Sequence, residues 1–163
     1  MAKNLEQIQA DSERNYLEAI LGFDGTALMF ASGYKLTIEV ARTELTQDYP
    51  HGFRYTLNLL GPDATGASVV RVLAADNAHA PDDRKHPHDH WHATKFGPAG
   101  TTPIDVKKGK YKKVNSIEKL IGDFIRASQK LLSKAGVATE VVAMSTPQKT
   151  RPRAAQDNEG PTR

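Results

Sequence analysis

Apolar residues at every second position constrain the fold of this chain more than any other feature. Residues 34–42 follow this alternation, and residues 53–60 repeat it. Successive side chains of a strand point to opposite faces, so both stretches are predicted to be strands with one buried face. Residues 27–30 and 69–75 are further short apolar runs, joined to the others by short links. Parallel strands need long crossovers, so the sequence predicts an antiparallel sheet of about four strands.

The most regular helical pattern begins at Asn115 and ends at Gly136, a residue that commonly terminates helices. Asn115 with Glu118 three residues later matches a capping box. An apolar stripe follows at helical spacing, formed by Ile117, Leu120, Ile121, Phe124, Ile125, Leu131 and Leu132. We therefore predict an α+β fold, in which this long C-terminal amphipathic helix packs on the antiparallel sheet.

The two ends of the chain differ from the domain between them. Residues 1–11 are polar and are predicted to be flexible, and residues 12–21 form a short helical pattern. Residues 145–163 combine several prolines with mixed charge, which predicts a disordered basic tail. Residues 12–144 then form a single α+β domain, which suits a chain of 163 residues.

Composition excludes several classes of protein. Cysteine is absent, so neither disulfides nor thiolate metal ligands are available. No apolar run approaches the roughly 20 residues that span a bilayer, so no membrane association is predicted. The first residues lack the apolar stretch of a signal peptide, and the cytoplasm is the expected compartment.

Residues 76–92 hold five of the six histidines and the only tryptophan, Trp91. Imidazole, with an ordinary pKa of about 6.5, is the side chain that changes charge near neutral pH. Such a concentration predicts a metal site, a proton-transfer site or a solvated, pH-dependent patch. The sequence leaves these three readings open.

A metal site would depend on which imidazoles share a side. If residues 86–92 are extended, neighbouring histidines at even positions lie about 6.6 Å apart on one face. A metal–nitrogen bond of about 2.0–2.1 Å lets one pair converge, such as His88 and His90, with a third ligand from Asp76 or His79. The expected ion is a divalent metal such as zinc. The candidate ligands within the extended stretch are His86, His88, His90 and His92.

The alternative is general acid–base catalysis on RNA. One imidazole would remove the proton of a 2′-hydroxyl and another would protonate the leaving oxygen. The candidate catalytic residues are His79, His88 and His90, with Asp76 orienting one ring. Cationic side chains would contact phosphate, although a lysine-rich run also occurs as a solvated loop. The candidate cations are Arg54, Arg71, Lys95, Lys107, Lys108, Lys110, Lys112 and Lys113.

The order of these features resembles the TumE family of toxins, over about residues 34–134. That family carries an Asp-Asn-Ala-Pro-His-His stretch and then a Pro-His-His-Lys-His stretch. The matching residues here are Asp76-Asn77-Ala78-His79 and Pro87-His88-Asp89-His90. The resemblance implies the toxin half of a toxin–antitoxin module, neutralised by a small DNA-binding antitoxin protein.

The chain also departs from the family pattern. Ala74-Ala75 stands where the family has Arg-Tyr before the aspartate, and Trp91 stands where it has lysine. A toxin that cleaves or binds RNA is therefore one expectation. A non-catalytic binding module, or an accessory subunit of a nucleoprotein complex, with the histidines in a metal-stabilised or solvated loop, is the other. Both expectations are compatible with an oligomeric protein.

Overall fold

The protein is an α+β fold with an antiparallel sheet, as predicted. The computed structural model describes residues 4–63, 65–79, 88–96, 103–106 and 110–146. The helices and strands in chain order are α1 (Leu5–Leu21), β1 (Thr26–Phe30), β2 (Lys35–Arg42), β3 (Phe53–Pro62), β4 (Val69–Asp76), β5 (His90–Phe96), β6 (Pro103–Val106), β7 (Lys110–Tyr111), α2 (Ile117–Lys134) and β8 (Val141–Ser145).

The prediction of about four strands is wrong, because the described residues form an eight-stranded sheet. The strand order is β6-β5-β4-β3-β2-β1-β8, and β7 pairs with β5 outside this path. Strands β1 to β4 correspond to the apolar stretches predicted from the sequence. The additional pairing at one side comes from β5, β6 and β7, which are short or rich in polar side chains and therefore lack a clear alternation.

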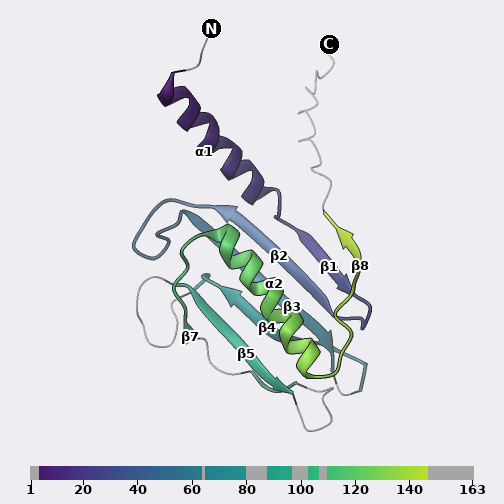
Figure 1. Ribbon diagram of the computed structural model, residues 1–163. Coiled ribbons are helices and arrows are strands. Elements are labelled where there is room, and N and C mark those ends of the chain that lie inside the picture. The colour runs from purple at the N-terminus through teal and green to yellow at the C-terminus, as the bar shows by residue number, and fades with distance from the viewer. Residues whose placement is uncertain (1–3, 64, 80–87, 97–102, 107–109, 147–163) are drawn as a thin grey trace, which may run out of the picture.

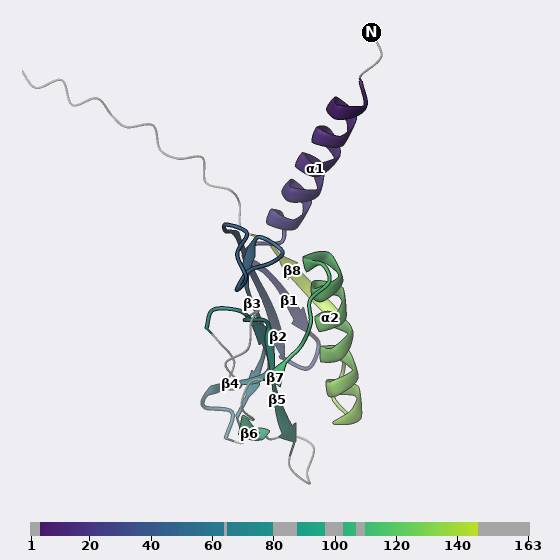
Figure 2. The ribbon, with the colours of Figure 1, turned by 90° about the vertical axis from the view of Figure 1, so that its left-hand side faces the viewer.

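Helix α2 covers one face of the sheet, as Figures 1 and 2 show from two directions. Most of its apolar stripe is buried, with Phe124 fully so and Ile125 and Leu131 half-buried, and the stripe packs against alternate residues of β2 and β3. The N-cap is Ser116 rather than Asn115, since the Ser116 hydroxyl accepts a hydrogen bond from the Lys119 amide at 3.1 Å. The helix is also not the last element, because β8 follows it and pairs with β1.

Helix α1 begins at Leu5, not at residue 12, and the Asn4 side chain caps it by accepting from the Gln7 amide at 2.8 Å. Only Ile20 of this helix is buried, and its N-terminal part projects beyond the sheet (Figures 1 and 2). Leu5 and Ile8 are the large apolar residues of its first two turns, too few to set a helical period from which to predict the earlier start.

The predicted tail begins differently from what the sequence indicated, because Ser145 belongs to β8. The remainder of the predicted tail, residues 147–163, lies outside the described residues. Among the described helices, neither combines the length and the apolar character needed to cross a bilayer.

A close approach between Gly61 and the Tyr34 ring gives a first prediction. A β-carbon at Gly61 of β3 would overlap that buried ring, so Gly61→Ala is expected to lower the free energy of unfolding by about 1–3 kcal/mol. Gly122→Ala in α2 is the control, because its nearest neighbour is the Arg126 guanidinium at 3.4 Å. It is expected to stabilise the protein by up to about 1 kcal/mol. Urea denaturation measures both, and equal effects would contradict the prediction.

Candidate functional site

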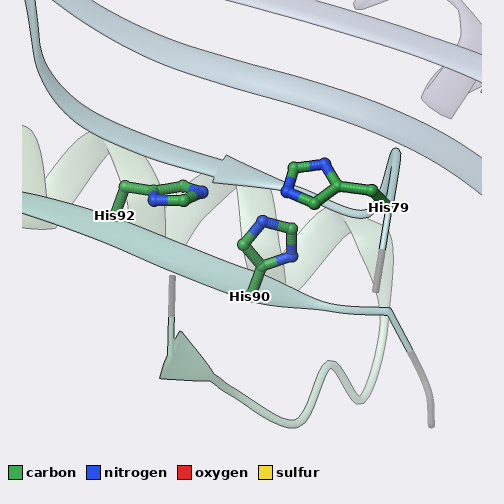
Figure 3. Close-up of side chains that lie close together, drawn as sticks. All are labelled: His79, His90 and His92. Carbon is green, nitrogen blue, oxygen red and sulfur yellow. The ribbon is translucent and has the colours of Figure 1, made fainter. Parts of the chain in front are cut away.

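The site lies on the face of the sheet opposite α2. In the antiparallel pair of β4 and β5, His90 stands opposite Asp76 and His92 opposite Ala74. Trp91, between the two histidines, points to the other face, where its ring centroid lies 5.4 Å from that of Phe124. Strand alternation therefore places both imidazoles on the face away from the helix, and Figure 3 shows α2 behind β5, the strand that carries them.

A buried asparagine shapes the turn that follows β4. The Asn77 side-chain oxygen accepts from the Tyr55 amide, and its nitrogen donates to the Phe53 carbonyl, both at 2.9 Å. The side chain thus bonds two main-chain groups of β3 and holds the chain at the end of the sheet. Asn77 therefore supports the turn, which brings His79 back toward β5.

Three imidazoles converge at this place, from His79, His90 and His92 (Figure 3). One nitrogen from each ring lies within 4.8 Å of the others. The ring centroids of His79 and His90 are 4.7 Å apart, as are those of His90 and His92. The three side chains therefore lie close enough together to bind one metal ion.

Asp76 supplies a carboxylate to the same cluster. Its Oδ1 is 3.3 Å from His90 Nε2 and 3.7 Å from His79 Nδ1, while its Oδ2 is 3.7 Å from His92 Nε2. The Asp76 side chain is only 6% exposed, whereas that of His79 is 64% exposed. The cluster therefore has a buried acidic floor, and His79 forms its solvent-facing side.

The hydrogen bonding of His90 defines its tautomer. Its Nδ1 lies 2.7 Å from the His88 carbonyl oxygen, which can only accept, so Nδ1 carries the proton. In the neutral ring Nε2 then presents a lone pair. This buried atom has no hydrogen-bond partner among the described residues and faces the Asp76 oxygen. A lone pair against a carboxylate is unfavourable, and a metal ion bound by both atoms would relieve the repulsion.

The distances fit a metal centre after small adjustments. Two ligand atoms of a tetrahedral zinc ion with bonds of about 2.0–2.1 Å are separated by about 3.3 Å. The distances from Asp76 to the three rings, 3.3–3.7 Å, are near this value. The widest nitrogen separation, within 4.8 Å, requires the rings to move closer, and the His79 side chain, which is 64% exposed, borders solvent.

His88 lies apart from the cluster, contrary to its prediction as a partner of His90. Its Nε2 is 3.5 Å from an Asp48 oxygen, and its ring packs edge-on against Tyr49. Alternation applies only within a strand, and β5 begins at His90. The main-chain amide of His88 instead donates to the Asp48 carbonyl, which directs its ring toward that loop. The other expected ligand of this stretch, His86, lies outside the described residues.

Among the predicted cations, Arg54 lies on the same face as the cluster. It alternates with the buried Phe53 and Tyr55 of β3, and its side chain reaches over the Tyr49 ring. Arg54 also lines a hollow of about 370 Å³, whose wall includes Asn77 beside Asp76. Arg54 is therefore the predicted cation that the described structure places on the face of the cluster.

The other predicted cations are not gathered at the cluster. The Lys112 ammonium lies 3.8 Å from the centroid of the Trp91 ring, on the α2 side of the sheet. Lys110 and Lys113, on either side of Lys112 along the chain, are both exposed. Arg71 lies on β4, five residues before Asp76. The side chains of the remaining three lie outside the described part of the chain: Lys95, Lys107 and Lys108.

Sequence reasoning missed a buried polar group on the α2 side. Asp89 is fully buried, and its Oδ1 accepts from the Tyr55 hydroxyl at 2.8 Å and lies 2.9 Å from His51 Nε2. His51 is the one histidine outside residues 76–92. The distance between His51 and Asp89 along the chain hid this contact. The signal available was Asp89 itself, because a carboxylate buried next to a strand needs a hydrogen-bond donor nearby.

No protein-family model, curated protein or solved structure matches this chain.

Proposed function

We propose that the chain is a TumE-like toxin that binds a divalent metal, zinc, through His79, His90 and His92 and cleaves RNA at this centre. The proposal rests on one observation above all, the convergence of three imidazoles on the buried Asp76 carboxylate. Imidazole nitrogen and carboxylate oxygen are ligands that suit zinc. The target RNA would be met in the cytoplasm, and a small antitoxin protein would neutralise the activity.

Each residue has a distinct part in the proposed reaction. Bound zinc would polarise a phosphoryl oxygen and lower the pKa of a bound water molecule. Asp76 would accept a proton from the attacking 2′-hydroxyl or water as its oxygen bonds to phosphorus, since the Asp76 carboxylate forms the floor of the cluster. The bond from phosphorus to the leaving ribose oxygen would break in the same step, and that oxygen would take a proton from water. Arg54, on the same face, would bind the phosphate and stabilise its developing charge.

Metal-free acid–base catalysis remains the closest alternative mechanism at the same residues. His79 and His90 have ring centroids 4.7 Å apart, so one ring can serve as base and the other as acid. Added zinc would occupy the nitrogens that this mechanism needs. Zinc therefore activates RNA cleavage under the first mechanism and inhibits it under the second.

One feature favours a different function, a binding module stabilised by metal. If Asp76 completes the coordination as a fourth ligand, the metal has four protein ligands, as in structural zinc sites. Catalytic zinc sites instead keep one position open for water or substrate. The metal would then join β4 to β5 without chemistry. Such a protein would gain thermal stability with zinc but would leave RNA intact.

The test measures cleavage of end-labelled RNA by the purified chain, with zinc and with a chelator. We expect cleavage that the chelator lowers at least tenfold (about 1.4 kcal/mol) and that zinc restores. A strand with deoxyribose at the cleaved positions distinguishes attack by the 2′-hydroxyl from attack by water. Induced expression in bacteria is expected to arrest growth.

The matched variants are the His90→Ala/His92→Ala pair and His88→Ala alone. The double variant removes two rings of the cluster and is expected to cleave no RNA and to permit growth. His88→Ala changes a histidine of the same segment whose ring lies against Asp48 and Tyr49, and it is expected to stay active. Equal growth arrest by wild type, the double variant and His88→Ala, or growth arrest by none of them, would refute the proposed function.

A further inference from the structure

A buried hydrogen-bonded group lies next to the cluster of His79, His90 and His92, on the other face of the sheet. Asp89 immediately precedes His90, and its carboxylate is fully buried. The Tyr55 hydroxyl and His51 Nε2 both contact the same oxygen, at 2.8 and 2.9 Å. The Tyr55 side chain belongs to the core, and that of His51 is only 9% exposed. Together these residues form the Asp89 anchor.

The main chain at this point is held as firmly as the side chain. The Lys112 amide donates to the Asp89 carbonyl, and the His88 amide donates to the Asp48 carbonyl, both at 3.2 Å. The anchor therefore joins the loop before β3, β3 itself and the segment after β7 to the two residues that precede β5. The position of the peptide group between His88 and Asp89 depends on all of these contacts.

That peptide group supplies the oxygen that orients His90. The His88 carbonyl accepts the Nδ1 proton of His90 at 2.7 Å, which leaves Nε2 for the cluster. Hydrogen bonds to the second nitrogen of a metal-binding histidine fix the ring and its tautomer. A rotation of the His88–Asp89 peptide would therefore turn the imidazole away from the place where its nitrogen meets those of His79 and His92.

We infer that His51 and Tyr55 are positioning residues for His90 and act through Asp89. This inference rests on the proposed function, because it takes His90 Nε2 as a metal ligand. Neither residue touches the cluster, which lies on the opposite face. Each supplies a donor to a carboxylate buried away from water, and removal of a donor leaves that charge under-solvated. Asp89 then relaxes toward solvent and moves the carbonyl that holds His90.

The experiment titrates Co²⁺, a visible probe for tetrahedral zinc sites, into the full chain freed of metal. Tyr55→Phe and His51→Ala are each expected to weaken Co²⁺ binding on the order of tenfold, the lower end for outer-shell partners of metal ligands. The visible absorption spectrum should change as well, because the orientation of one ligand changes. His51→Gln keeps an N–H donor for Asp89 and is expected to restore most of the affinity.

Tyr34→Phe is the matched control, since it removes a hydroxyl from another buried tyrosine, which lies against Gly61 at a distance from the cluster. It is expected to keep the wild-type affinity and spectrum. Titrations are run well below the lowest melting temperature in the series, so that a loss of stability alone leaves the affinity unchanged. Wild-type affinity and spectrum in both Tyr55→Phe and His51→Ala would overturn the inference alone. A wild-type chain that binds no Co²⁺ or Zn²⁺ would overturn the proposed metal centre together with it.

Discussion

Phe124→Ala is expected to lower the free energy of unfolding by about 3–5 kcal/mol. The Phe124 ring is fully buried where α2 meets the sheet, and its centroid lies 5.4 Å from that of Trp91. Truncation removes apolar surface from the core and leaves a cavity that a helix and a sheet cannot close without shifting. Urea denaturation, followed by circular dichroism and by the fluorescence of the single tryptophan, measures the loss.

Phe23→Ala provides the comparison for this substitution. The Phe23 ring is 39% exposed, just after α1, so the same truncation is expected to cost less than about 1 kcal/mol. If the two variants lose equal stability, the buried contact between α2 and the sheet does not carry the weight assigned to it.

The parts of the fold that the sequence predicted are those with one clear period. In β3 the buried positions are Phe53, Tyr55, Leu57 and Leu59, and these alternate with polar residues. The burial of α2 follows its stripe in the same way. Each segment buries a single face, and that one-sided environment makes the period visible in the chain.

Segments without a one-sided environment were not predictable in this way. Strand β8 is exposed at every position, and β5 carries polar side chains on one face because the site lies there. The first turns of α1 are exposed all round, so no apolar spacing marked its start. These elements depend on pairing or capping partners that are distant in sequence or that leave no repeating pattern.

The same distinction separates the features of the site that the sequence predicted from those that it did not. The alternation of even and odd positions correctly predicted that His90 and His92 share one face of the strand. Trp91, between them, lies on the other face. The place where β5 begins could not be read from the sequence, and it separates His88 from the cluster. The partner of Asp89 was equally hidden, because His51 lies 38 residues away and meets it only in the folded chain.

His90→Ala is expected to weaken zinc binding by about 10²–10³-fold. Structural zinc sites with four ligands bind with about 10–16 kcal/mol, which is roughly 2.5–4 kcal/mol for each ligand, and one ring of this three-histidine cluster is expected to contribute a similar amount. His90 is the fully buried member of the cluster, and its ring is already held by the His88 carbonyl with Nε2 facing Asp76. Competition against a zinc-binding dye at fixed pH measures the affinity.

Two further proteins make the result specific to the cluster. His79→Ala removes the exposed ligand and is expected to cost less than His90→Ala, because an ordered ring loses less conformational freedom on binding than a mobile one. His88→Ala leaves the main-chain carbonyl that His90 uses and is expected to keep most of the affinity. Zinc stabilises the folded form in proportion to ln(1 + [zinc]/Kd), so at one zinc concentration the melting temperature should rise as much for His88→Ala as for wild type and clearly less for His90→Ala. An equal rise in all of these proteins would place the metal somewhere other than at these three rings.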